Sequence, residues 1–456
     1  MYKRQAQAST TSGNHAAILD LSGLDTFKLT AGRLLVAGNY ASAVARAAGT
    51  LILAKTNVIR LNGAAPALCE GDDPGNGGGT FNSFQLGQTN SLFVDTMTIA
   101  RTKMNGTCTL SFNPALAGNN PALYLRGNTT AQVSALAIGD DSAISGSGSS
   151  SIGTVDLSLG TVDALVNTCY VGRGQNGNGG GGGNGTLTLG AGVFNVNTLF
   201  VAYVSASTAV ANTVGTVNVN ASGTLVVNST LALGVNPAST PTATATLNIT
   251  NGTVLANSIT SSAALVNSTI NLVGGTLVIS NTAGTSAAPL TTLALDGGTL
   301  QLNVNGNVST TNIVAASVTT GATSTINIGS VANVSGTVQI PLISYTGTDP
   351  FSALNLGTYP AGYNATLVDN TGKNSIDLSL APAIATNPTN ITFNVSGHTL
   401  NLSWPLDHLG WLVQSNSANL AVPAYWYDIP STAAGTNYSI TIDATKANVF
   451  YRLRKP

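Results

Sequence analysis

Apolar and polar residues alternate through most of the middle of this chain, in short runs that end near glycine. One run begins Thr186-Leu-Thr-Leu-Gly-Ala-Gly-Val-Phe-Asn-Val, and the next begins Thr216-Val-Asn-Val-Asn-Ala-Ser-Gly-Thr-Leu-Val. A period of two places Leu, Val and Ile on one face of a β-strand and Thr, Asn and Ser on the other. Glycine supplies the positive φ that sharp corners require. The pattern therefore predicts short strands joined by tight corners.

The runs recur every 23 to 33 residues. Their first threonines are Thr154, Thr186, Thr216, Thr246, Thr269, Thr292 and Thr325. The phrase Gly-Thr-(Leu/Val) begins at Gly185, Gly215, Gly223, Gly252, Gly275 and Gly298. One unit cannot bury its apolar face alone, whereas stacked units build a continuous core. The predicted fold is all-β: a right-handed parallel β-helix (β-solenoid) of roughly 12–15 coils, about 60–70 Å long, in which Val226 and Leu277 face inward.

Ionisable side chains are missing from the most regular part of the repeat. The 122 residues from Gly174 to Leu295 include no Asp, Glu, Lys, Arg or His. Equivalent side chains of stacked coils are about 4.8 Å apart, where like charges repel one another. Neutral Asn and Thr can form ladders instead. This segment also lacks the groups that acid–base catalysis needs, so it predicts a structural stack.

Composition narrows the classes of function. Charged residues make up 7% of the 456 residues and the net charge is −1, so charge does not drive binding to nucleic acid or anionic membranes. No apolar run approaches the roughly 18 residues of a membrane-spanning helix. Cys69, Cys108 and Cys169 form no Cys-x-x-Cys pair and are predicted to be buried apolar residues, without a disulfide framework. No cofactor is predicted.

Composition also divides the chain. Residues 1–16 are an unstructured start, and Met1-Tyr-Lys-Arg-Gln5 matches adapter read-through, which indicates a fragment whose true N-terminus and signal peptide lie upstream. The predicted solenoid is 17–380, with charged, irregular coils in 17–173, regular coils in 174–338 and a cap in 339–380. Residues 381–388 are a linker. All three tryptophans lie in 389–456, which is predicted to be a small β-sandwich-like module.

The Gly-Thr-Leu coils, over roughly residues 150–380, resemble the autotransporter-associated β-strand repeat of bacterial surface proteins. Four segments of the tail, Leu402-Ser-Trp-Pro405, Gly410-Trp-Leu-Val-Gln-Ser-Asn416, Trp426-Tyr-Asp-Ile-Pro430 and Val449-Phe-Tyr-Arg-Leu453, resemble a C-terminal module of secreted solenoid proteins from Verrucomicrobia-like bacteria. The resemblance implies an extracellular or cell-surface protein, exported by separate machinery because the 68-residue tail is too short for a translocator barrel. It carries over no catalytic residue.

An enzyme is the main alternative, because β-helices also host polysaccharide lyases and hydrolases, which need paired carboxylates or a carboxylate beside a base. The candidates are Glu70, Asp72, Asp73, Asp140 and Asp141, with Arg101, Lys103 or Arg126 as basic partners. The alternative interpretation is that these residues are solvated charges on loops, without a catalytic role. A calcium site at Asp72 and Asp73 is a further interpretation, although the established calcium-loop sequences are absent.

The remaining motifs do not indicate a functional site. The glycine-rich segment 174–185 lacks the Gly-Lys-(Ser/Thr) ending of a phosphate loop and is interpreted as a spacer. His15, His398 and His408 are too scattered to indicate a metal site or a triad. An ice-binding face would need a Thr-x-Thr in every coil, and Thr242-Ala-Thr-Ala-Thr246 alone comes close.

The aromatic residues of the tail have two interpretations. Trp411, Trp426 and Tyr427, with Trp404 and Tyr425, either fill the core of the module or form a platform on which sugars stack. A core is favoured for a domain of this size. The sequence therefore predicts a non-enzymatic structural or adhesive β-solenoid, with polysaccharide binding or degradation through the charged N-terminal coils as the alternative.

Overall fold

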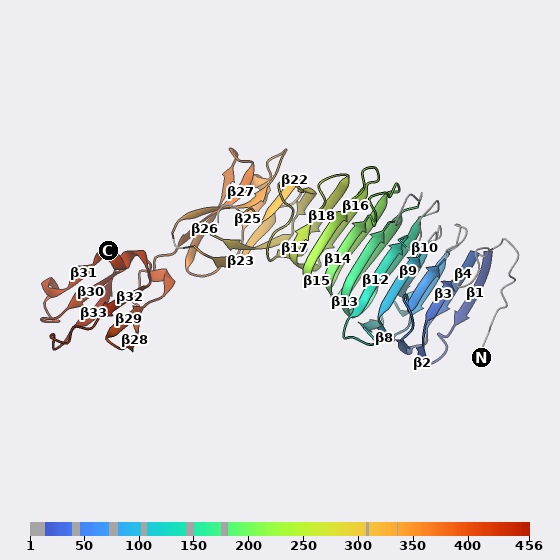
Figure 1. Ribbon diagram of the computed structural model, residues 1–456, viewed down its shortest axis with the longest axis horizontal. Helices are drawn as coiled ribbons and strands as arrows, with labels where there is room; N and C mark the ends of the chain where they lie inside the picture. Colours follow the sequence, from blue (N-terminus) through green and yellow to red (C-terminus); the bar gives the residue numbers. More distant parts are fainter. Residues whose placement is uncertain are drawn as a thin grey trace.

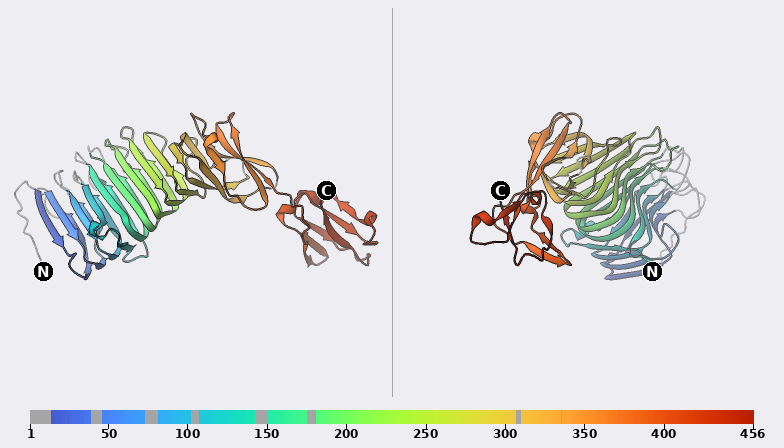
Figure 2. Two further views of the ribbon diagram at one scale, coloured as in Figure 1. Left: turned by 180° about the vertical axis from the view of Figure 1, so that it is seen from behind. Right: turned by 60° about the vertical axis from the view of Figure 1, so that its left-hand side comes forward.

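The computed structural model describes residues 14–38, 46–72, 81–101, 107–142, 150–174, 181–306, 310–334 and 336–456. It confirms the predicted class: a parallel β-solenoid of about ten turns is followed by small antiparallel sheets. The coils stack along the long axis, and the C-terminal module lies beyond the last of them (Figure 1). Seen obliquely, successive coils superimpose on one another (Figure 2).

Three parallel sheets run along the solenoid, and each full coil contributes one strand to each sheet. Three long strands bend through all three sheets, namely β13 (Ser151–Arg173), β14 (Gly183–Tyr203) and β15 (Thr213–Val235). The first sheet also contains β1 (Asn14–Asp20), β4 (Arg46–Ile52), β7 (Asn82–Leu86), β10 (Thr107–Phe112), β16 (Ala243–Thr250), β18 (Val266–Val273), β20 (Leu290–Asp296) and β22 (Ile313–Thr320).

The second sheet contains β2 (Thr26–Ala31), β5 (Thr56–Leu61), β8 (Thr89–Val94), β11 (Ala122–Arg126), β17 (Thr253–Thr260), β19 (Thr276–Ile279), β21 (Thr299–Asn305), β23 (Ser324–Ala332) and β25 (Leu354–Leu356). The third contains β3 (Leu34–Gly38), β6 (Leu68–Asp72), β9 (Thr96–Arg101) and β12 (Val133–Asp140). Figure 1 labels β3, β9 and β12 of the third sheet, which follow one another in this order along the stack.

The register of the first sheet follows the repeat in the sequence. Thr154 pairs with Thr186, and the column continues through Thr216, Thr246, Thr269 and Thr292. The last alignment was wrong, because Thr292 pairs with Ser317 whereas Thr325 stacks on Thr299 in the second sheet. The Gly-Thr phrase precedes strands of both sheets and cannot by itself distinguish them.

The number of residues per coil depends on the length of the coil's third side. Residues in register are 30 apart from β15 to β16 but 23 apart from β16 to β18. Beyond β17 the third sheet continues in the described residues only as the single bridges Ile259–Ala283 and Ala283–Ile313. The predicted 12–15 coils were too many, because early coils are long (45 residues separate Thr107 from Ile152) and 338–382 forms a cap. About ten turns give a stack about 50 Å long.

A continuous column of aliphatic side chains fills the solenoid. Leu277 is fully buried and stacks between Val254 and Leu300 of the adjacent coils. The inward position predicted for Val226 was wrong, because Leu225 and Val227 are buried while Val226 lies between them at the surface. The run Leu-Val-Val is apolar at three successive positions, so alternation alone does not set its phase.

Neutral side chains form ladders on the outer surface of the charge-free segment, as predicted. The amide nitrogen of Asn218 donates to Thr188 Oγ1 (3.1 Å), that of Asn248 to Asn218 Oδ1 (2.8 Å) and that of Asn271 to Asn248 Oδ1 (2.7 Å). Four coils of the charge-free segment are thereby joined outside the backbone ladder. Because each amide both donates and accepts, one residue type continues the ladder indefinitely.

Replacing Asn248 and Asn271 together by Asp should destabilise the stack by about 1 kcal/mol more than the two single substitutions combined, because like charges face each other across adjacent coils. The excess should shrink in 1 M salt, which screens exposed charges. Urea denaturation at low and high salt measures both effects. The matched control is N248D with N271K, which loses the same amide ladder without repulsion. An equal loss in both double variants would contradict the explanation.

A second Asn ladder lies inside the solenoid and was not predicted. Asn57 and Asn90 are buried at equivalent positions of adjacent coils, and Asn57 Nδ2 donates to Asn90 Oδ1 (2.9 Å). Asn90 also accepts from the Gly87 amide (2.9 Å) and donates to the Gly87 carbonyl (2.7 Å). These bonds satisfy backbone groups at the corner before the second sheet.

Antiparallel strands close the C-terminal end of the solenoid. β24 (Val338–Ser344) pairs with β27 (Ser375–Pro382), which also pairs with β26 (Tyr363–Asn370). Ile340, Leu342, Ile376 and Leu378 of these strands are buried against the last coils. Such a cap covers the apolar end of the stack and occupies strand edges that would otherwise remain open.

The C-terminal module consists of two three-stranded antiparallel sheets. Leu402, Trp404 and Val413 form its buried core. Its strands are β28 (Thr392–Ser396), β29 (Thr399–Ser403) and β32 (Asn437–Thr441) in one sheet, and β30 (Leu412–Asn416), β31 (Tyr427–Ile429) and β33 (Phe450–Arg454) in the other.

The helices of the described residues are short 3₁₀ helices of three to five residues: η1 (Pro114–Leu116), η2 (Phe351–Ala353), η3 (Leu406–His408), η4 (Pro423–Tyr425) and η5 (Pro430–Ala434). Within the described ranges, none of these helices has the length and apolar character needed to cross a membrane.

Candidate functional site

Several candidate catalytic residues meet in one row at the end of the third sheet, which we call the charge ladder: Asp72, Arg101, Asp140 and Arg173. Asp72 pairs in register with Arg101, Arg101 with Asp140, and Asp140 with Arg173. Arg101 Nη1 lies 2.8 Å from Asp72 Oδ2, and Arg173 Nη1 lies 3.8 Å from Asp140 Oδ2. Opposite charges therefore alternate from coil to coil, which replaces repulsion by attraction.

The charge ladder brings together Asp72, Asp140 and Arg101, as an enzyme would require, but it also occupies them. Asp72 and Asp140 are largely buried and each faces a guanidinium on the neighbouring coil. A general acid or base must reach a substrate proton, and burial together with the facing guanidinium shields both carboxylates from a substrate. The geometry favours a structural role for these residues.

Glu70, another candidate acid, points into the core. Its register position is filled by Val36 and Ile99 in the neighbouring coils, and its side chain is fully buried. Oε1 accepts a hydrogen bond from the Thr109 amide (2.9 Å), while Oε2 has no partner among the described residues. Burial raises the pKa of Glu70 to about 8, only partly opposed by that hydrogen bond. Glu70 is therefore a buried, largely protonated carboxyl group at neutral pH.

The other candidates in this region are dispersed. Asp141 is buried and accepts from Ser151 Oγ at 3.4 Å. Asp73 and Lys103 lie outside the described residues, so the calcium interpretation of Asp72 with Asp73 stays a prediction. Within the described ranges, no three His, Cys, Asp or Glu side chains come together as a metal site would require.

The three cysteines are free and buried, as predicted, and burial raises the pKa of each thiol above its ordinary value. Of the histidines, the side chain of His15 lies outside the described part. His408 is buried in the C-terminal module, where Nδ1 lies 2.7 Å from Asp407 Oδ1 and Nε2 lies 2.8 Å from the Asn387 carbonyl. His408 thus fastens the linker to the module.

A second row lies on the outer face of the second sheet and involves one predicted residue, Arg126. Arg60 Cζ is 3.8 Å from the centroid of the Phe93 ring, and Arg126 Cζ is 4.0 Å from that of Tyr124. The two rings pack edge to face with centroids 6.0 Å apart. Arg126 Nη2 also forms an ion pair with Asp163 (2.7 Å). The row spans four successive coils.

Arg60, Phe93 and Tyr124 were missed, although the sequence contains a signal for them. Thr56-Asn-Val-Ile-Arg60 and Thr89-Asn-Ser-Leu-Phe93 share a Thr-Asn start 33 residues apart, and Arg126 follows Phe93 by another 33. Aligning these two segments, rather than the later Gly-Thr repeats, would have placed all three residues in one column or beside it.

A third cluster joins the end of the charge ladder. The rings of Tyr170 and Phe200 are stacked at 5.0 Å, and Tyr203 packs against both. Arg173 Cζ lies 4.5 Å from the Tyr170 centroid. All four side chains are half-buried, so the cluster covers the outside of the third sheet at β13 and β14.

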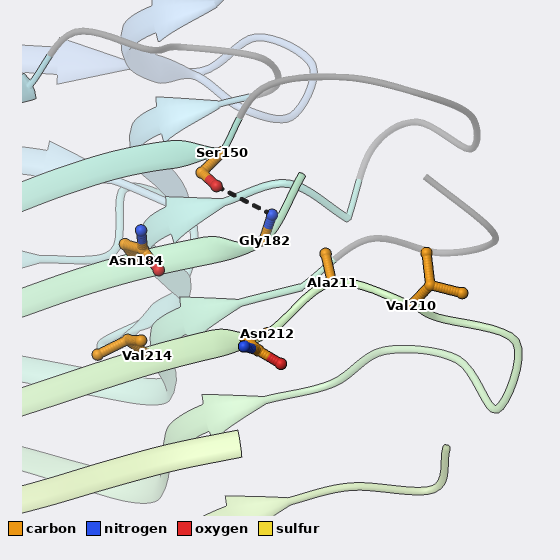
Figure 3. Close-up of a pocket in the computed structure, with 7 residues that line it drawn as sticks. All are labelled: Ser150, Gly182, Asn184, Val210, Ala211, Asn212 and Val214. Carbon is orange, nitrogen blue, oxygen red and sulfur yellow. Dashed lines mark hydrogen bonds between the residues drawn. The ribbon is translucent and has the colours of Figure 1, made fainter. Parts of the chain in front are cut away.

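A hollow near the starts of β14 and β15 contains no ionisable group. It is lined by Ser150, Gly182, Asn184, Val210, Ala211, Asn212 and Val214, and the Gly182 amide donates to Ser150 Oγ (3.2 Å) across it (Figure 3). A neutral lining of this kind offers neither an acid–base pair nor a nucleophile with its base.

In the C-terminal module the aromatic residues separate into two groups. Trp411 is only 5% exposed, its Nε1 donates to the Ala385 carbonyl (3.1 Å) and its ring packs on His408. It is a core residue, which is the interpretation that the sequence favoured, and the alternative of glycan contact does not hold for it. Trp426 is half-buried beneath Arg452, whose Cζ is 4.1 Å from the ring. Tyr427 is 64% exposed. Glycan contact therefore stays a prediction for Trp426 and Tyr427.

Comparison with known proteins does not assign this architecture to a family. No family model matches the chain, and no curated protein and no solved structure matches it either.

Proposed function

We propose that this protein is an extracellular or cell-surface structural shaft, the stack of coils serving as a rigid, adhesive spacer without catalysis. The observation that carries the proposal is the environment of the candidate catalytic acids. Those that the structure describes are held by arginines, as Asp72 and Asp140 are, or buried, as Glu70 and Asp141 are.

The stacking itself supports a mechanical role. Backbone ladders join every consecutive pair of coils from β1 to β23, and Asn ladders reinforce them inside and outside. Each coil adds a similar set of bonds to its neighbours, so stiffness extends along the whole stack. The low content of charged residues and the resemblance to autotransporter-associated repeats favour display outside the cell, with export by separate machinery.

Turnover of polysaccharides tests the proposal against its enzymatic alternative. The intact chain should produce no new reducing ends and no unsaturated sugars from acidic or neutral glycans. Turnover that disappears in Asp72→Ala or Asp140→Ala would overturn it. Asp20→Ala, which removes an exposed carboxylate at the end of β1, is the matched control. Melting curves of all variants confirm that loss of turnover does not reflect loss of fold.

A further inference from the structure

We propose that the outer face of the second sheet binds an acidic polysaccharide along a cationic strip made of Lys28, Arg60, Phe93, Tyr124 and Arg126. The strip crosses four successive coils, on β2, β5, β8 and β11. The inference deepens the proposed adhesive role by naming a site and a ligand class.

Two of the three cationic side chains of the strip, Lys28 and Arg60, lack an ion pair within the described residues. Lys55, Arg101, Arg126 and Arg173 each form an ion pair with a neighbouring aspartate. Neither Lys28 nor Arg60 has an ion pair or hydrogen bond to any residue in the described ranges, and both side chains are exposed. Thr30 pairs in register with Arg60, so Lys28 lies one coil away and two residues along the strand.

The Arg60 guanidinium is held in place before any ligand arrives. Its Cζ lies 3.8 Å from the Phe93 centroid, and this stacking contact leaves the fork of N–H donors without a partner among the described residues. Such a fork matches the two oxygens of a carboxylate or sulfate group. Arg126 stacks likewise over Tyr124. However, its Nη1 donates to the Leu125 and Asp163 carbonyls and its Nη2 pairs with the Asp163 carboxylate, so Arg60 is the main anion-binding group of the strip.

The form of the strip fits a linear polymer. Its residues lie on an open sheet face, with one functional group on each of β2, β5 and β8 and two on β11, and adjacent coils are about 4.8 Å apart along the axis. A small molecule would need a concave site to bury enough of its surface. Tyr124 is 39% exposed and can pack against the apolar face of a sugar ring between the cationic groups. A repeating, negatively charged glycan meets both requirements.

Binding of polygalacturonate by the intact chain, followed by titration calorimetry, tests the inference. We expect saturable binding that weakens with salt, no binding of fully methyl-esterified polygalacturonate, and at least a tenfold loss of affinity in Arg60→Gln. Phe93→Leu keeps every charge but frees the Arg60 side chain, so it should also weaken binding several-fold. Lys55→Gln removes an exposed charge from the same coil and should leave the affinity unchanged.

Other outcomes overturn the inference. Absence of binding to both polygalacturonate and dextran sulfate would do so, whereas binding of one alone identifies the recognised anion as carboxylate or sulfate. An equal loss in K55Q and R60Q would show unspecific charge attraction. Equally tight binding of single-stranded DNA or of anionic lipid vesicles would assign the strip to a different partner. If the chain neither binds these glycans nor cleaves them, the ligand inference fails but the proposal of a structural shaft stands. If the chain cleaves a glycan, the proposal of a shaft without catalysis fails, whatever the strip binds.

Discussion

Replacing Leu277 by Asp should unfold or severely weaken the solenoid. Leu277 is fully buried between Val254 and Leu300, so a carboxylate there would lose its hydration without gaining a partner. Even Leu277→Ala should cost about 2–5 kcal/mol, because it leaves a cavity between coils. The Asp variant should lose more than that. The midpoint of urea denaturation, followed by far-UV circular dichroism, measures both effects.

Val226 offers a matched control within the same sheet. Its side chain lies outside, in register with Asn195 and Leu255 of the neighbouring coils. Val226→Asp should therefore change stability by about 1 kcal/mol or less. A similar loss of stability for the substitutions at positions 226 and 277 would mean that the observed alternation of faces is incorrect.

Glu70→Gln should make the protein more stable than the parent chain at alkaline pH but not at acidic pH. The carboxyl group has an ordinary pKa of 4.5, which burial raises to about 8 in the folded chain. Below pH 4.5 it is protonated in both states and costs nothing. As the pH rises from 4.5 to 8, it ionises only in the unfolded state, so folding stability is lost. The loss reaches several kcal/mol, on the order of 5, above pH 8.

Gln keeps an oxygen for the Thr109 amide and removes the titration. The difference in stability between E70Q and the parent should therefore grow steadily between pH 5 and pH 8. Urea denaturation at half-unit intervals measures it. Asp20→Asn is the control, because the pKa of this exposed carboxyl lies below its ordinary value, so its effect is constant over the same range. Parallel curves for E70Q and the parent would show that Glu70 is ionised in the folded chain.

The regular half of the fold could be predicted because one chemical pattern repeats there. The threonine column from Thr154 to Thr292 follows directly from alternation and spacing. The assignment of Thr325 failed because strands of the first and second sheets carry the same Thr-Leu/Ile pattern. Spacing alone cannot tell which side of a coil a strand occupies.

The rows of charged and aromatic residues were not predicted, because this requires the register between coils, and the N-terminal coils show too little regular repetition to infer it directly. Asp72, Arg101, Asp140 and Arg173 are separated by unequal intervals, since the loops between them differ in length. Their proximity emerges only when the coils are stacked. For Trp411 the sequence left both a core position and a glycan-binding face open, and the burial of its side chain decides for the core.

Amide hydrogen exchange of the intact chain, read by mass spectrometry, tests the central claim that the charge-free segment is one continuous structural stack. Peptides from β14, β15, β16 and β18 should exchange at least about a thousandfold more slowly than an unfolded chain, and together as one unit. Peptides from β2 and from the loop at 204–212 should exchange sooner. Fast exchange of peptides from β14, β15, β16 or β18, at the rate of that loop, would contradict the account.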